Sequence, residues 1–193
     1  MDKKLSEKLF LSLWMVDFDY ISTRHLLAGS LFPSAASLAN ITMDRYIKTY
    51  LWSIERNDLV ERIKGWGGNE SHNVFRMVNL YEEEFNDSLN LSEQEKNTLK
   101  DIYMCYCFRY IDVMYIKKGM CKIFKNYMYT IDKVCHFFRE KIKLIPPHQG
   151  NTIIDILFEN NSQKVASLNT GNINPREVLL ADNLYFRIQD KSH

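Results

Sequence analysis

The sequence predicts a mainly α protein: an up-and-down helical bundle of about five helices over residues 1–145, followed by a small C-terminal extension over residues 146–193. Two observations predict this fold class. Apolar residues recur at three- and four-residue intervals along most of the first segment, which is the spacing of one helix face. In addition, 46% of the 193 residues are hydrophobic and only 7 are Gly and 4 are Pro, so the chain can bury a core without disulfides or metals.

Two long helices are expected at the start of the chain. Apolar residues over Leu5–Leu27 fall on one helical stripe, and Gly29 is expected to end this helix. A second helix is expected after Pro33, where apolar residues again recur on one face. Its small residues Ala36 and Ala39 would let a neighbouring helix pack closely.

Shorter helices are predicted in the middle of the chain. A helical stretch around Leu59–Ile63 precedes a glycine-rich loop, 65–68, which lacks the Lys-Ser/Thr pair of a phosphate-binding loop. A third helix is predicted over Asn73–Glu84. Ser92 and Glu95 then form a capping box, which is the clearest helix start in the sequence.

The helix that begins at this capping box should end near Arg109. A last long helix is predicted from about Tyr115 to Lys143, before the pair Pro146-Pro147. In the extension, apolar residues alternate in two short segments, which predicts strands. These alternating residues are Ile154, Ile156 and Phe158 in one segment and Leu184, Phe186 and Ile188 in the other. The alternative is a short helix after Asn174-Pro175, but we favour a small β-rich extension.

The charge balance gives the molecule almost no net charge and therefore no overall electrostatic attraction to polyanions. The chain has 25 Lys and Arg residues against 24 Asp and Glu residues, so a nucleic acid or an anionic membrane would have to be met by a local patch. The apolar stretch Leu9–Val16 is followed by Asp17 and Asp19, which does not fit a signal peptide. No run reaches the length of a membrane span. We therefore expect a cytoplasmic protein that does not enter the membrane.

The cysteines do not form a metal-binding pattern. They lie at positions 105, 107, 121 and 135, where neither the gaps nor a matching second pair fits a zinc site. We expect buried free thiols, which suit a reducing compartment. No metal and no cofactor is predicted.

Three segments resemble one known family. Residues 30–51, SLFPSAASLANITMDRYIKTYL, resemble the second-helix signature of HEPN domains, a family of helical nucleotide-binding proteins. Residues 71–74, Ser-His-Asn-Val, resemble the opening of that family's third helix. Residues 108–112, Phe-Arg-Tyr-Ile-Asp, resemble the segment before its last helix. The resemblance covers about residues 17–143 and implies a helical bundle.

The chain departs from the family at Ile41, Thr49 and Ile111. Ribonuclease members carry an Arg followed after about four to six residues by a His, a pair suited to polarising a phosphate and moving a proton. Within residues 17–143 no Arg has a His at that spacing; Arg62, for example, lies ten residues before His72. The resemblance therefore implies the non-catalytic branch of the family.

A basic stripe follows one side of the predicted last helix. Its members fall within about 60° of Lys118 on a helical wheel. They are Lys118, Lys122, Lys125, Lys133, His136, Arg139 and Lys143. Such a stripe can follow nucleic-acid phosphates through salt-sensitive contacts. The alternative, which we favour, is a solvated face compensated by the acidic segment 82–95 of the same chain or of a partner.

Further candidate residues follow from the resemblance and from local chemistry. In the resemblance, Asp44, Arg45 and Lys48 line a groove for a nucleotide phosphate or a second subunit; the alternative is an Asp44–Lys48 pair on a helix flank. His72 has either a structural hydrogen bond or a chemical role. Arg109 and Tyr110 could supply a phosphate fork and a stacking ring, or Arg109 could cap a helix end.

We therefore expect a non-catalytic HEPN-like binding or interaction module. The resemblance implies nucleotide or nucleic-acid binding, partnership with a minimal nucleotidyltransferase as in toxin–antitoxin pairs, and a homodimer. The alternatives are a purely structural helical dimerisation protein and a ribonuclease-like enzyme whose site the sequence does not reveal.

Overall fold

The computed structural model describes residues 3–108, 127–145, 152–158 and 174–187. Every regular element in these ranges is helical, so the mainly α fold class is confirmed. Arg109, Tyr110, Lys118, Lys122 and Lys125 lie outside the described residues. None of the helices in these ranges is both long enough and apolar enough to cross a lipid bilayer.

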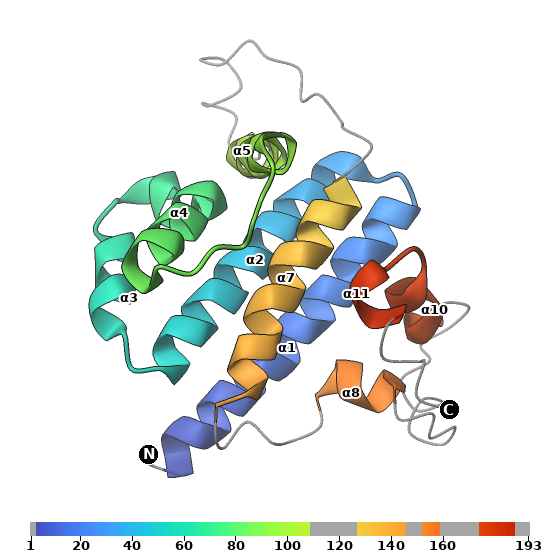
Figure 1. Cartoon of the computed structure of the whole chain (residues 1–193). Coiled ribbons are helices and arrows are strands. Elements are labelled where there is room, and N and C mark those ends of the chain that lie inside the picture. The colour runs from blue at the N-terminus through green and yellow to red at the C-terminus, as the bar shows by residue number, and fades with distance from the viewer. Residues whose placement is uncertain (1–2, 109–126, 146–151, 159–173, 188–193) are drawn as a thin grey trace.

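Three long helices form the centre of the fold (Figure 1). They are α1 (Lys3–Ala28), α2 (Phe32–Ser53) and α7 (Tyr127–Lys143), the described part of the predicted last helix. α2 packs against both of the others. Ala35, Ala36 and Ala39 are completely or almost completely buried, which agrees with the expectation that small residues on α2 allow close packing.

The turn between α1 and α2 is built differently from the expected glycine stop. Ser30, not Gly29, adopts the left-handed conformation, with φ of 60°. The Ser30 N–H donates to the Leu27 carbonyl oxygen at 3.0 Å, and the Leu31 N–H donates to that of Leu26 at 2.9 Å. This pattern satisfies the last carbonyl groups of α1 as a Schellman motif does.

The shorter helices cover one side of α2 (Figure 1). They are α3 (Asn57–Lys64), the 3₁₀ turn η1 (Gly68–His72), α4 (Val74–Phe85) and α5 (Glu93–Cys107). The capping box of α5 is confirmed: the Ser92 N–H donates to the Glu95 carboxylate at 2.7 Å, and the Glu95 N–H donates to Ser92 Oγ at 3.3 Å. Asn73 is the N-cap of α4, and its side chain accepts from the Arg76 N–H at 3.1 Å.

The β-strands expected in the extension are wrong for its described residues. These form α8 (Ile153–Phe158), α10 (Pro175–Leu180) and α11 (Leu184–Arg187), and α10 is the alternative helix that follows Asn174. Hydrogen bonds to polar side chains start each helix: Asp155, Asn174 and Asn183 each accept from a nearby backbone N–H. A short apolar run fits the spacing of a helix as well as that of a strand, and these hydrogen bonds in the first turn favour the helix.

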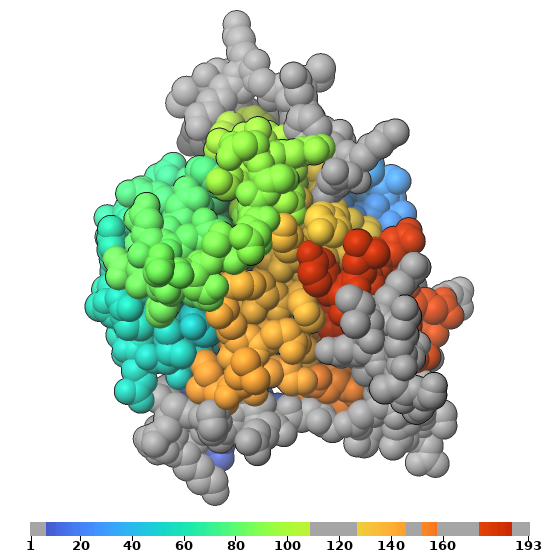
Figure 2. Space-filling model, in the orientation of Figure 1, coloured from blue at the N-terminus to red at the C-terminus, as the bar shows by residue number. Residues whose placement is uncertain are grey.

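The extension packs into the same hydrophobic core as the bundle. Its buried residues in that core are Ile153, Ile154, Leu157, Leu179 and Phe186. The Arg24 side chain of α1 holds the chain around α10, because its guanidinium donates to the carbonyl oxygens of Val178, at 3.0 Å, and Ala181. Figure 2 shows α7 at the surface between the α4–α5 segment and α11.

Candidate functional site

Three residues singled out in the sequence meet where α2 passes η1. His72 Nδ1 lies 3.3 Å from Asp44 Oδ2, and Lys48 Nζ lies 2.5 Å from Asp44 Oδ1. Lys48 also donates to the Ser71 carbonyl oxygen at 3.0 Å. Asn40, one turn before Asp44, donates to the His72 carbonyl oxygen at 2.8 Å. We call Asn40, Asp44, Lys48 and His72 the His72 cluster.

The local sequence explains why the loop meets α2 here. Gly67 and Gly68 adopt positive φ angles of 73° and 46°, which side chains disfavour and glycine permits. The turn that follows is closed by the Ser71 hydroxyl, which donates to the Gly68 carbonyl oxygen at 2.8 Å. Asn73 then caps α4, so His72 lies directly before the start of a helix.

The two members of the Asp44–His72 pair differ in exposure. The Asp44 side chain is 8% exposed, whereas that of His72 is 40% exposed. A buried carboxylate beside Nδ1 favours the tautomer with the proton on Nδ1, which leaves Nε2 as the nitrogen for an external partner. Neutral Nε2 can accept a hydrogen bond, and protonated Nε2 can donate one to an anion.

Two tyrosines of α5 lie on the side of the His72 imidazole that faces the protein. The ring centroids of His72 and Tyr106 are 5.5 Å apart, and those of Tyr106 and Tyr103 are 6.4 Å apart. The Tyr103 hydroxyl donates to Glu70 in η1 at 2.9 Å, and burial raises the pKa of Tyr103. Both tyrosines are buried, so they brace the loop and do not offer a stacking surface to a ligand.

Arg45 is not part of the His72 cluster. Its guanidinium pairs with Asp19 of α1 on an exposed part of the surface. The cluster therefore contains three of the residues proposed from the sequence, Asp44, Lys48 and His72. Asn40 was missed, because an Asn inside a helical pattern gives no separate signal in the sequence.

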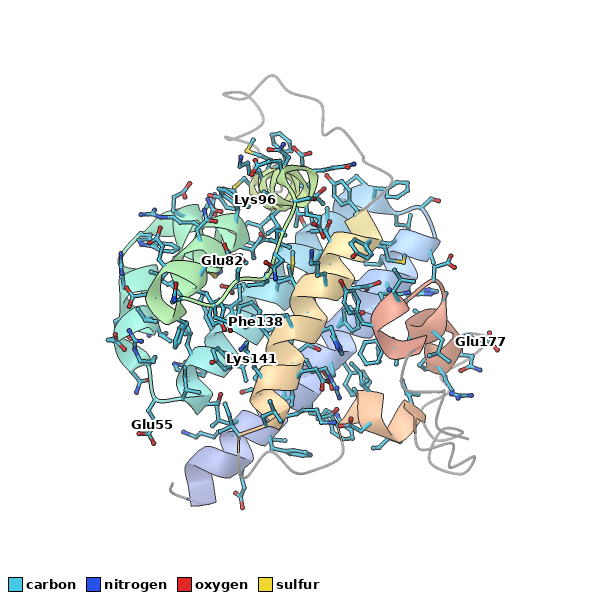
Figure 3. The ribbon with its side chains drawn as sticks, viewed as in Figure 1. Glu55, Glu82, Lys96, Phe138, Lys141 and Glu177 are labelled. Carbon is cyan, nitrogen blue, oxygen red and sulfur yellow. The ribbon has the colours of Figure 1, made fainter. Side chains whose placement is uncertain are left out.

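The described half of the basic stripe is matched by acids of the same chain. Lys133 pairs with Glu95 at 3.0 Å, and Lys143 pairs with Asp155 at 2.5 Å. On the neighbouring side of α7, Lys141 pairs with Asp87 at 2.7 Å, and Lys141 and Phe138 face the α4 side of the fold (Figure 3). Glu95 and Asp87 belong to the acidic segment 82–95. For α7 these pairs favour the compensated alternative over a phosphate track.

Arg139, a further member of the stripe, is not at the surface at all. Its Nη2 donates to Thr152 at 2.9 Å and to Asp155 at 3.0 Å, and its Nε donates to the buried Asp17. Burial acts to raise the pKa of Asp155, but Arg139 and Lys143 outweigh it and lower that pKa to about 2. Arg139 thus fixes α8 to the bundle.

A second buried arginine was also missed. Arg24 pairs with Asp132 of α7, which accepts a hydrogen bond from Tyr20 at 2.7 Å. The signal in the sequence was the position of Asp17, Tyr20 and Arg24, which fall on the inward, otherwise apolar stripe of the first helix. Charged residues at such positions need buried partners.

Cys105, Cys107 and Cys135 are buried and form no disulfide bond, as expected for these three. In the part of the chain that the structure describes, no group of three or more His, Cys, Asp or Glu side chains is placed to hold a metal ion.

No protein-family model, no curated protein and no solved structure matches this chain.

Proposed function

We propose that this chain is a non-catalytic helical module, similar to HEPN domains, that binds a nucleotide, free or within RNA, at the His72 cluster. One observation carries this proposal. His72 is a half-exposed imidazole whose Nδ1 faces the buried carboxylate of Asp44, so that Nε2 is presented in a fixed orientation.

The chemistry around His72 suits a phosphorylated sugar. α4 begins two residues after His72, and the first N–H groups of a helix have no partner within it and carry the positive end of its dipole. Because the Arg76 N–H already donates to the Asn73 cap, a phosphate oxygen would accept chiefly from protonated Nε2 of His72, at the positive end of the α4 dipole. A ribose hydroxyl can donate to neutral Nε2. Lys48, at 3.0 Å from the Ser71 carbonyl oxygen, keeps the loop in place.

The resemblance supports the same surface. Two of the three segments that carry it, 30–51 and 71–74, are joined by two contacts: Asn40 donates to the His72 carbonyl oxygen, and the Asp44 carboxylate accepts from His72 Nδ1. Partnership with a minimal nucleotidyltransferase rests on the resemblance alone and stays a prediction, to be tested by co-purification of the two proteins.

Binding is favoured over nucleophilic catalysis by the neighbours of His72. The residue directly before His72 is Ser71, and its hydroxyl donates to the Gly68 carbonyl oxygen. The Tyr103 hydroxyl donates to Glu70. The hydrogen-bond partner of the imidazole at Nδ1 is the Asp44 carboxylate, which orients the ring and is not a hydroxyl or thiol nucleophile.

Calorimetric titration with AMP, ATP and a short single-stranded oligoribonucleotide tests the proposal. His72→Ala should weaken binding at least about tenfold, equivalent to about 1.4 kcal/mol. His25→Ala, which removes a partly buried histidine near the end of α1, is the matched control and should bind like the wild type. Absence of binding by the wild type, or equal weakening by both variants, would contradict the proposal.

A further inference from the structure

The outward face of α1 carries an apolar patch. Leu11, Met15 and Phe18 are 60%, 56% and 39% exposed. Phe10 and Trp14 lie beside them, half-buried, and the ring centroids of Trp14 are 5.9 Å from Phe10 and 6.1 Å from Phe18. We call Leu11, Trp14, Met15 and Phe18 the α1 patch.

This patch departs from the pattern of an ordinary surface helix. The inward face of α1 is apolar as well, since Leu9, Leu13, Val16 and Tyr20 are buried in the bundle. A helix at the surface of a monomer normally carries polar residues on its outward face, and a contiguous apolar patch of this kind marks an interaction surface. Farther along α1 the outward residues become polar, beginning with Ser22.

We propose that a second copy of this chain covers the α1 patch, with the two α1 helices antiparallel about a two-fold axis between Trp14 and Met15. The spacing of the patch is symmetric about that point. In this register Leu11 lies opposite Phe18 of the partner subunit, and Trp14 lies opposite Met15 of the partner subunit. A two-fold interface requires such a self-complementary surface.

The charges that flank the patch favour the antiparallel direction. Glu7 and Lys8 are exposed at its N-terminal end, and Asp19 and His25 lie beyond its other end. The antiparallel register brings Lys8 within one helical turn of Asp19 of the partner subunit, where Lys8 would join the partly exposed pair of Asp19 with Arg45, and it brings Glu7 within one turn of His25 of the partner subunit. A parallel pair would place Lys8 against Lys8 of the partner subunit, which is repulsive.

This interface is independent of the proposed nucleotide site, because it uses the outward face of α1 and none of the His72 cluster. It also differs from the sequence-based expectation that a basic stripe meets the acidic segment 82–95. In the described residues, Glu84, Asp87 and Glu95 of that segment already pair with cations of their own chain. The α1 patch, in contrast, is apolar surface with Leu11 and Met15 more than half exposed among the described residues.

Sedimentation velocity at low and high micromolar concentration tests the proposal. The wild type should form a dimer, and the double variant Leu11→Glu, Met15→Glu should sediment as a monomer of 22.9 kDa. Leu144→Glu is the matched control, because Leu144 is 82% exposed and lies at the end of α7, outside the patch. A wild type that stays monomeric, or a dimer that persists in the double variant, would overturn the proposal.

Cysteine pairing tests the direction. Under mild oxidation, a mixture of the Leu11→Cys and Phe18→Cys variants should form a disulfide-linked dimer of one chain of each kind. Neither variant alone should do so, because each new thiol lies opposite the other position. Efficient linking of each variant to itself would overturn the antiparallel arrangement.

Discussion

Arg139 of α7 donates from Nε to the Asp17 carboxylate of α1, 122 positions earlier in the chain, at 3.2 Å from Oδ1. The Tyr46 hydroxyl of α2 donates to the same oxygen at 2.5 Å. All three side chains are buried. Burial raises the pKa of Asp17, and the charge of Arg139 and the hydrogen bonds from Thr152 and Tyr46 act against that rise. This cluster ties the three central helices to one another.

Removing Arg139 should therefore destabilise the fold strongly. Arg139→Met leaves the Asp17 carboxylate buried without its cation, which we expect to lower the free energy of unfolding by about 3–5 kcal/mol. Lys141→Met, on the same helix but partly exposed, should cost less than about 1 kcal/mol. Urea denaturation measures both changes. Similar losses of unfolding free energy in the two variants would mean that the buried Arg139–Asp17 pair stabilises the fold no more than the partly exposed Lys141–Asp87 pair does.

The α10–α11 segment should depend on Asn183. Its amide donates to the Tyr20 hydroxyl at 2.8 Å, and its Oδ1 accepts from the Tyr185 N–H at 3.2 Å. Asn183→Ala removes both bonds, so we expect a loss of about 1–3 kcal/mol. Hydrogen exchange should accelerate over residues 175–187 and remain unchanged in α4. Uniform acceleration throughout the chain would show that the effect is not local.

The helices of the bundle could be predicted because their signals are local. Apolar periodicity placed α1 and α2, and Ser92 with Glu95 fixed the start of α5. The short helices of the extension could not be separated from strands in this way. The run Ile153–Phe158 is too short to show a period, and its conformation is tied to Asp155 and to the distant Arg139.

The candidate site was predictable in its parts and not as a whole. The Asp44–Lys48 pair follows from the i, i+4 spacing and is present. The contact between Asp44 and His72 joins positions 28 apart, so it depends on how the loop meets α2. Arg139 was misread because charge on a helical wheel does not reveal an acidic partner on another helix.

Acidification should destabilise the protein through His136. Burial lowers the pKa of His136, and the positive charge of Arg139 lowers it further, whereas Glu140 raises it. The ring is held against Tyr185 and Phe186. In the unfolded chain this pKa is about 6.5, so the unfolded state binds the proton first and stability falls as the pH drops through that value.

The His136→Gln variant isolates this effect. The free energy of unfolding is measured at several values from about pH 7.5 to about pH 5.5, around the ordinary pKa of histidine. The difference between wild type and variant should change with pH in favour of the variant as the pH falls. A difference that stays constant would show that His136 does not titrate differently in the folded state.

The purified protein should not cleave RNA. Within residues 17–143 no Arg and His have the spacing of the ribonuclease members of the family that the chain resembles. Arg187 and His193 do have about that spacing, but they follow the segment that carries the resemblance. Metal-independent cleavage that disappears in His193→Ala or Arg109→Ala would contradict the prediction. The assay is gel analysis of a labelled single-stranded RNA.

The most direct test of the proposed function is the nuclear magnetic resonance signal of the His72 ring during a nucleotide titration. The chain has 5 His residues, and comparison with His72→Gln assigns the signal. On addition of AMP or a short oligoribonucleotide, the Nε2 and ring C–H signals of His72 should shift in a saturable manner, while those of His25 remain in place. Unchanged His72 signals at ligand concentrations that saturate binding would contradict the account.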